Sequence, residues 1–221
     1  MAIKNIKIII ILLILSGCSS NKDYDSVKKT VDIFLGSEKE NKIKSFTREE
    51  IYSFNYPIIE IRTEGIVKQV LMLPISTRKS YTNWITGTGQ AITMEGSAVT
   101  KTNGFDTGLL SVKLEEKSPL IFHVKPNDWP ESEKITYGFL TEMNSQYNVE
   151  VICEHHILEN EDILILDKYL NLIHINSKCS GKEIFFENDY WLDEEGFIWY
   201  SNQLISNKKI MANIKFLKRT Y

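Results

Sequence analysis

The feature that most constrains this chain is an alternation of apolar and polar residues with a period of two. It begins near residue 59 and recurs as far as residue 218. Its first instance sets Ile59, Ile61 and Thr63 against Glu60, Arg62 and Glu64. Successive side chains of a β-strand point to opposite faces, so this pattern predicts strands with one buried face. Gly65 then predicts a turn into the next strand.

Further stretches of this kind, bounded by turn residues, are predicted as strands: 66–73, 90–94, 98–102, 109–114, 135–143, 148–158, 163–166, 170–176, 185–192, 197–204 and 210–218. Short strands joined by tight turns are typical of antiparallel sheets. A sheet this large must protect its edge strands from pairing with other chains. We therefore predict an all-β fold, a large antiparallel meander sheet curled into a barrel-like or sandwich domain.

One or two short helices are expected before the strands. Asp25-Ser26 can cap a helix with apolar residues at helical spacing between Val27 and Leu35, which Gly36 ends. Thr47-Arg48-Glu49-Glu50 before Ile51 is typical of a capping box that opens a turn or two of helix. The residue before a proline disfavours the helical region, so Tyr56-Pro57 ends this second helix.

Residues 1–17 have the composition of a secretory signal peptide. Lys4 and Lys7 precede an apolar run from Ile8 to Leu15, and small residues follow. A transmembrane helix needs about 20 apolar residues. Polar residues begin directly after Cys18, so the run is too short to span a bilayer.

Leu15-Ser16-Gly17-Cys18 resembles the lipobox cut by the lipoprotein signal peptidase. A cysteine is needed there because its thiolate can take a diacylglycerol as a thioether. Further acylation, for example with palmitate, would give enough buried methylenes for stable anchoring. Ser19 rather than Asp after the cysteine suggests sorting to the outer membrane. We therefore expect a lipidated tether over residues 18–22 and a single domain over residues 23–221, facing the periplasm.

The charge balance argues against a nucleic-acid partner. The chain has 26 Lys and Arg against 29 Asp and Glu, a net charge of −3. Removal of residues 1–17 takes away two lysines and no acid, which leaves 24 against 29 and a net charge of −5. Proteins that bind nucleic acid usually carry a basic footprint. Mature residues in this number can form one domain with a substantial core.

Cys153 and Cys179 remain once Cys18 carries lipid. An even pair in an oxidising compartment favours a disulfide, but pairing requires a Cα separation below about 7 Å that a sequence does not reveal. Neither cysteine has metal-like spacing. The neighbouring His155 and His156 alternate faces on a strand, so no metal site is expected.

The sequence contains no recognisable catalytic motif, and neither an enzyme activity nor a cofactor is expected. Glu194-Glu195 could be read as a glycosidase pair, but neighbours on a turn point apart, whereas such carboxyls flank one bond about 5–9 Å apart. Gly87-Thr88-Gly89 is interpreted as a loop, since no helix follows it. Trp191 and Trp199 are expected in the core, whereas Trp129, in a loop before Pro130, is the better candidate for exposure.

Several short motifs, in their order and spacing, resemble the YjbF/GfcB family of group 4 capsule polysaccharide lipoproteins. They are Tyr56-Pro57, the hairpin through Arg62 and Gly65, Leu71-Met72-Leu73, Trp84-Ile85-Thr86, Met94-Glu95-Gly96, Thr100-Lys101-Thr102-Asn103-Gly104-Phe105, Tyr190-Trp191-Leu192-Asp193, Gly196 and Phe216-Leu217-Lys218. The resemblance is clearest from Thr47 onward and weakest between Glu131 and Glu183.

The resemblance implies an all-β outer-membrane lipoprotein that serves capsule or exopolysaccharide production or export. It implies periplasmic and outer-membrane protein partners, and polysaccharide itself as a further candidate partner. It supplies no catalytic residues. Two function classes follow. One is a non-catalytic accessory factor with a filled core, and the other is a half-open β-barrel that carries a lipid or a lipid-linked sugar.

Overall fold

The computed structural model describes residues 46–63, 67–105, 108–141, 143, 145–182 and 184–219. The chain divides into two compact units, Met1–Lys42 and Ile43–Tyr221, and all of these residues lie in the second. Its elements are the helix α3 (Arg48–Tyr52), the 3-10 helix η1 (Pro126–Asp128) and the strands β1 (Ile58–Thr63), β2 (Val67–Arg78), β3 (Tyr81–Ile85), β4 (Ala91–Glu95), β5 (Ala98–Asn103), β6 (Leu109–Lys113), β7 (Ser132–Leu140), β8 (Gln146–Ile165), β9 (Lys168–Gly181), β10 (Phe185–Leu192), β11 (Ile198–Leu204) and β12 (Met211–Lys218).

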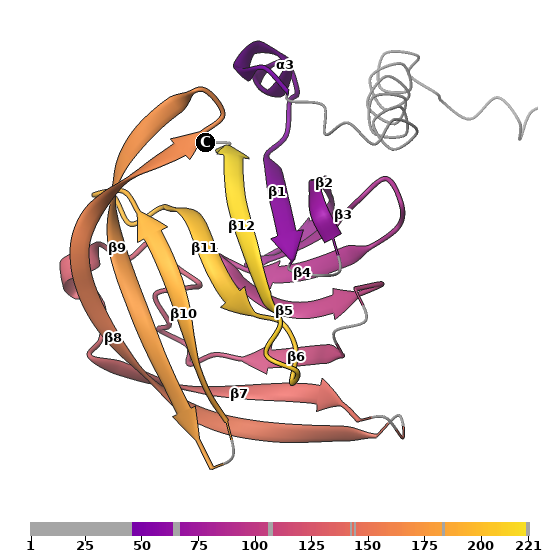
Figure 1. The fold of residues 1–221 in the computed structure, drawn as a ribbon, viewed down its shortest axis with the longest axis vertical. Helices are drawn as coiled ribbons and strands as arrows, with labels where there is room; N and C mark the ends of the chain where they lie inside the picture. Colours follow the sequence, from indigo (N-terminus) through magenta and orange to yellow (C-terminus); the bar gives the residue numbers. More distant parts are fainter. Residues whose placement is uncertain are drawn as a thin grey trace, which may run out of the picture. The chain divides into compact units, whose positions relative to one another are not determined.

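The strands form one sheet in the order β5-β4-β3-β2-β1-β12-β11-β10-β9-β8-β7-β6. Neighbouring strands in this order are antiparallel, and β1, the first strand in the sequence, pairs with β12, the last. The sheet curls into a nearly closed barrel, so that its edge strands β5 and β6 approach each other (Figure 1). The predicted fold class, an all-β antiparallel meander with a barrel-like shape, is confirmed.

The main differences from the predicted strands concern β2, β3 and β8. The chain continues as β2 through Pro74 to Arg78 and returns as β3, which the alternation pattern missed. A register shift between Pro74 and Ser76 accommodates the proline, which has no N–H to donate. The predicted strands 148–158 and 163–166 are one continuous strand, β8, whose polar middle contains a bulge between Ile157 and Asn160.

Helix α3 begins as the capping box predicted. The Thr47 hydroxyl accepts the Glu50 N–H, and the Glu50 carboxylate accepts the Thr47 N–H. Ile51, on its inner side, packs against Ile58 and Leu217 at the start of β1 and the end of β12. The helix expected between residues 25 and 36 lies outside the described residues.

Side chains from all round the sheet fill the barrel. The largest cluster of buried residues draws on almost every strand and includes Ile59, Ile61, Met72, Trp84, Ile92, Met94, Val99, Phe105, Leu109, Ile135, Tyr137, Phe139, Val151, Phe186, Leu204 and Ile214. Burial of each large apolar side chain contributes roughly 1.5–3 kcal/mol. The interior is therefore a packed core.

Polar side chains bind the edge strand β5 to β11 and to the other edge strand, β6. Gln203, on β11, accepts the Val99 N–H and donates to the Ser97 carbonyl, both at β5. The Thr102 hydroxyl, also on β5, donates to the Leu109 carbonyl of β6 at 3.4 Å. Unpaired backbone groups at a sheet edge need partners, and these side chains supply them.

A long connection, residues 114–131, links β6 to β7 and packs against two hairpin turns. Gly96, in the β4–β5 turn, has φ 57°, and Gly196, in the β10–β11 turn, has φ 87°. A Cβ on Gly96 would collide with the Leu120 carbonyl, and one on Gly196 with the Val124 carbonyl. Glycine is required at both turns because the connection approaches their backbone so closely.

We predict that Gly96→Ala and Gly196→Ala will destabilise the protein more than Gly89→Ala. Gly89 also has a positive φ, of 88°, but no atom lies within 4 Å of an added Cβ. Gly89→Ala should therefore lower the free energy of unfolding by only about 1 kcal/mol, the penalty for placing an alanine in the left-handed conformation. The other two variants should lose roughly 1–3 kcal/mol more through overpacking. Urea unfolding measures the difference, and equal losses in all three variants would contradict the close packing.

Candidate functional site

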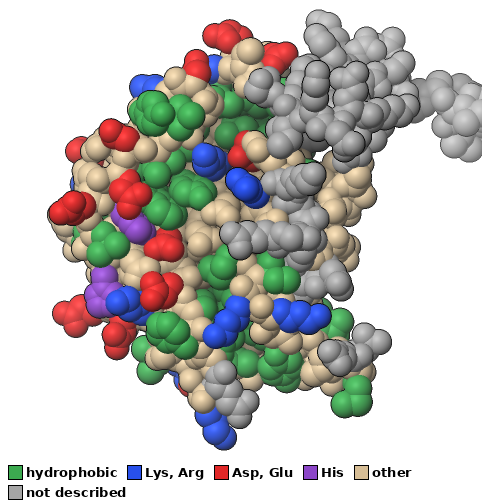
Figure 2. Space-filling view, viewed as in Figure 1, with side chains coloured by type: hydrophobic (Ala, Val, Ile, Leu, Met, Phe, Trp, Pro, Cys, Tyr) green, Lys and Arg blue, Asp and Glu red, His purple; other side chains and the backbone are tan. Residues whose placement is uncertain are grey.

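The outer face of strands β9 to β12 carries a row of stacked rings, here called the aromatic row. His174, Trp191, Tyr200 and Lys215 lie opposite one another on successive strands. The ring centroids of His174 and Trp191 are 4.4 Å apart, and those of Trp191 and Tyr200 are 4.6 Å apart. The Lys215 ammonium lies 5.3 Å from the Tyr200 ring centroid. Figure 2 shows histidine, acidic, basic and apolar side chains intermixed on this face.

Acidic residues hold the rings of this row in place. His174 has Glu161 2.8 Å from Nδ1 and Asp189 2.9 Å from Nε2. The Trp191 indole N–H donates to the other Glu161 oxygen at 3.1 Å. Trp191 is consequently only 9% exposed, and both ring faces are covered by its neighbours. The prediction that Trp191 is buried is correct, but it is buried on the outer face and not in the barrel.

The tip of the β8–β9 hairpin reaches toward β12 and α3. The Lys215 ammonium donates to the Leu164 carbonyl at 3.2 Å. Arg48 of α3 donates to the Ile165 carbonyl at 3.1 Å and pairs with Asp167 at 2.6 Å. Since Glu161 also lies on this hairpin, the hairpin borders the aromatic row.

A second row of polar side chains, here called the amide row, runs beside the first. It comprises Asn176, Asp189, Asn202, Asn213 and Arg62, which lie opposite one another on β9, β10, β11, β12 and β1. The Tyr200 hydroxyl donates to the Asn213 side-chain oxygen at 2.6 Å, which links the two rows. Burial raises the pKa of Tyr200, so its hydroxyl stays protonated at neutral pH.

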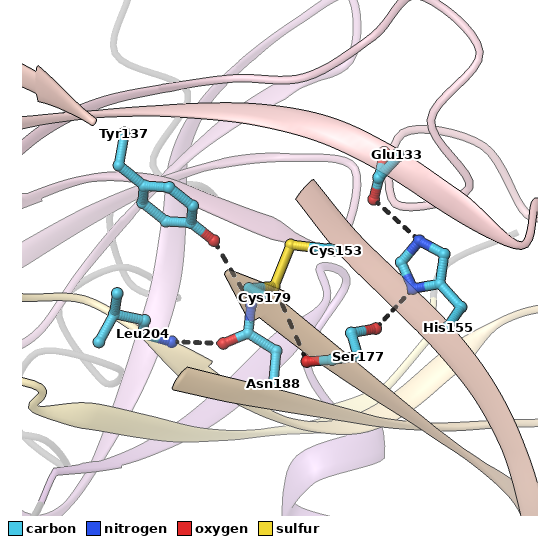
Figure 3. Close-up of a disulfide and its surroundings, with 8 residues drawn as sticks. All are labelled: Glu133, Tyr137, Cys153, His155, Ser177, Cys179, Asn188 and Leu204. Atoms are coloured by element: carbon cyan, nitrogen blue, oxygen red, sulfur yellow. Dashed lines mark hydrogen bonds and ion pairs between the residues drawn. A yellow bond between two sulfur atoms is a disulfide. The ribbon is translucent and has the colours of Figure 1, made fainter. Parts of the chain in front are cut away.

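Inside the barrel, Cys153 and Cys179 are joined by a disulfide (Figure 3). The two residues lie opposite each other on β8 and β9, with Cα atoms 3.9 Å apart, and neither is exposed. The bond therefore links two neighbouring strands at a fully buried position.

Three buried polar residues lie next to the disulfide (Figure 3). The Ser177 hydroxyl is 2.7 Å from Nδ1 of His155, and Nε2 of His155 is 3.6 Å from a Glu133 carboxylate oxygen. A serine, a histidine and an acid are the residue types of a hydrolytic triad. Here, however, Ser177 is 1% exposed and the other two side chains are 3% and 2% exposed, so no substrate reaches the hydroxyl.

Further buried polar residues connect neighbouring parts of the interior. The Asn188 side chain donates to the Tyr137 hydroxyl at 3.4 Å and accepts the Leu204 N–H at 2.8 Å. Burial raises the pKa of both Tyr137 and Tyr190, which keeps these phenols neutral. The interior thus combines apolar packing with fixed polar bridges.

The remaining tryptophans and the turn glutamates singled out in the sequence are not part of either row. Trp129 is partly buried, packs on His155 and Tyr190, and donates its N–H to the Val124 carbonyl, so the expectation that it is exposed is wrong. Trp199 is partly buried and donates to Asp193. Glu194 is exposed on its turn, and Glu195 pairs with Arg219 at 3.2 Å.

The other expectations concern the metal site and the membrane anchor. The part of the chain that the structure describes brings together no group of three side chains able to hold a metal ion. The described residues also include no helix long and apolar enough to cross a bilayer. Cys18 and residues 1–22 lie outside them, so the lipid anchor remains a prediction from the sequence.

Sequence reasoning missed Glu133, Ser177, Asn188 and the amide row. A signal was available in Phe186-Glu187-Asn188-Asp189-Tyr190, where polar residues fall on both faces of a strand whose pattern places one face in the core. The partners of these residues come from other strands, so the sequence alone could not bring them together.

The fold and these clusters define a nearly closed antiparallel β-barrel with a filled interior. The family model for the group 4 capsule polysaccharide lipoprotein GfcB, YjbF, matches residues 28–217, and the chain belongs to this family. The expected family is thereby confirmed. The chain is similar in fold to a crystal structure of the hypothetical lipoprotein YmcC from Escherichia coli (K12), with a TM-score of 0.70 and 15% identity, over 86% of this chain and 96% of that one. No curated protein matches the chain.

We predict that the protein isolated from an oxidising compartment has no free thiol before reduction. The Cys153–Cys179 bond closes a loop with a sequence separation of 26 residues, which should stabilise the fold by about 3 kcal/mol on the chain-entropy model. Cys153→Ala/Cys179→Ala should therefore lower the melting temperature by roughly 10 °C. Alkylation of both cysteines in the unreduced protein would disprove the bond.

Proposed function

We propose that this protein is a non-catalytic accessory factor in the production or export of capsule or another exopolysaccharide, held by lipid at the outer membrane with its domain in the periplasm. The observation that carries the proposal is the family match over residues 28–217, which begins ten residues after the cysteine of a lipobox-like segment. Its partners are then periplasmic and outer-membrane proteins of the same export system, or the polysaccharide itself.

The non-catalytic role is supported by where the reactive side chains lie. Ser177 and His155, the pair closest to a nucleophile and its base, are enclosed in the core with Glu133. General acid–base catalysis requires the catalytic group within hydrogen-bond reach of the substrate. Asp193, at the β10–β11 turn, accepts from the Phe197 N–H and the Trp199 indole, which is a structural role.

The carrier alternative has less support. A lipid carrier needs an apolar cavity of several hundred Å³. In this barrel the inward positions are filled by large side chains such as Met72, Trp84, Phe105 and Phe139, each at most 3% exposed. A filled core suits a protein that acts through its surface.

We predict that deletion of the gene will reduce surface and shed polysaccharide while growth and general envelope integrity stay nearly normal. Wild-type protein should restore export, and Glu194→Gln should restore it equally, since Glu194 is exposed on its turn. Quantified cell-bound and secreted polysaccharide measures the effect. Normal export from the deletion strain, under conditions where neighbouring export genes are needed, would refute the accessory role.

We also predict that Cys18→Ser will abolish lipidation. A thioether to diacylglycerol requires the Cys18 sulfur, which serine lacks. Cells labelled with palmitate should incorporate it into the wild-type protein and not into the variant. A soluble form with a cleavable signal should fold yet restore export poorly, because the protein acts where it is anchored. Normal palmitate incorporation in Cys18→Ser would exclude this anchor.

A further inference from the structure

We propose that the outer face of β9–β12 and β1 binds a neutral glycan chain along the amide row. This inference rests on the proposed function, because it identifies polysaccharide as a direct ligand. The amide row places Asp189, Asn202, Asn213 and Arg62 on four successive strands. With about 4.8 Å between strands, the part of the row from Asp189 to Arg62 extends roughly 14 Å. It is therefore long enough to follow an oligosaccharide across the sheet.

The amide row has hydrogen-bonding capacity that the protein does not use. His174 Nε2 and the Asn176 side-chain amide both lie within hydrogen-bond distance of the same Asp189 oxygen, Oδ1. Arg62 is exposed and forms no hydrogen bond or ion pair with any described residue. The side-chain oxygen of Asn202 also has no partner among the described residues, but it is buried, so a ligand does not reach that atom. Asp189 and Arg62 can exchange hydrogen bonds with sugar hydroxyls in place of water.

The aromatic row makes this face rigid and gives it an apolar border. Tyr200 and Trp191 are two residues along their strands from Asn202 and Asp189, so they point to the same face, roughly 7 Å away. Because the faces of the Trp191 ring are covered, a sugar would meet the edges of the stack and not a free ring face. The stack's contribution is to fix the side chains with which the hydroxyls pair.

The charges of the two rows indicate a neutral ligand. Within the rows, Asp189 stands against Arg62 and Lys215, and Glu60, which lies opposite Lys215 on β1 and points to the same face as Arg62, balances the remaining positive charge. Exposed Glu161 and Glu187 lie beside them. A polyanion would approach these carboxylates against like-charge repulsion, whereas a chain of neutral sugars would meet only donors and acceptors.

Affinity electrophoresis tests this site with purified full-length mature protein. The probe is the polysaccharide shed by the source cells, separated by anion exchange into neutral and acidic fractions and cast into native gels. We expect the neutral fraction to retard the wild-type protein. Arg62→Ala/Asn213→Ala should weaken the retardation by about tenfold or more, as expected for the loss of two hydrogen bonds, one of them charged.

The matched control is Arg78→Ala/Asn148→Ala, which removes the same residue types at exposed positions on β2 and β8, outside both rows. It should bind like the wild type, and melting temperatures should show all three proteins folded. No retardation of wild-type protein, stronger retardation by the acidic fraction, or equal losses in the two double variants would each overturn the site.

The binding result and the deletion result separate this inference from the proposed function. If deletion reduces export but neither polysaccharide fraction binds the protein, the accessory role stands and acts through protein partners. If the neutral fraction binds but deletion leaves export normal, the site is right and the proposed function is wrong.

Discussion

The pairing of β1 with β12 is the constraint on which the rest of this structure depends. It joins the beginning and end of the described β domain in the middle of the sheet and leaves β5 and β6 as the edges. Because these edges come from strands adjacent in sequence, the curl of the sheet brings them together without a long crossover. Thr102 then joins the two edges through its hydrogen bond to the Leu109 carbonyl, and Gln203 of β11 supplies further hydrogen bonds to the edge strand β5.

Once the barrel closes, the two faces of each strand have different roles. On β10, Asn188 and Tyr190 face a packed interior, whereas Asp189 and Trp191 face outward. Buried polar groups are costly unless paired, so the inner polar residues are bound to fixed partners such as Tyr137 and Leu204. The outer polar residues retain unused capacity. The outer face is therefore the face that can bind the proposed glycan, and the packed interior keeps its side chains in fixed positions.

Much of the fold could be predicted because alternation reports burial directly. The capping box of α3, the antiparallel meander and most of the strands follow from local patterns in residues 47–218. The prediction ended a strand at Pro74 and divided β8 at its polar middle, because both positions interrupt the alternation pattern. In the structure a bulge at each position lets the strand continue. Glu133 and His155 could not be paired in advance, since only the register of β7 with β8 brings them together.

A single bulge shows how much of the candidate site depends on register. On β11, Ile198 lies opposite Leu192 and faces the core, yet Tyr200 lies opposite Trp191 and faces outward. Residues two apart should share a face, so the register shift between Trp191 and Leu192, which makes Trp199 the extra residue, exchanges the faces. Without it, Tyr200 and Asn202 would point into the barrel, and Gln203 would point away from the β5 edge that it binds. The outer rows and the closure of the barrel therefore depend on the same extra residue.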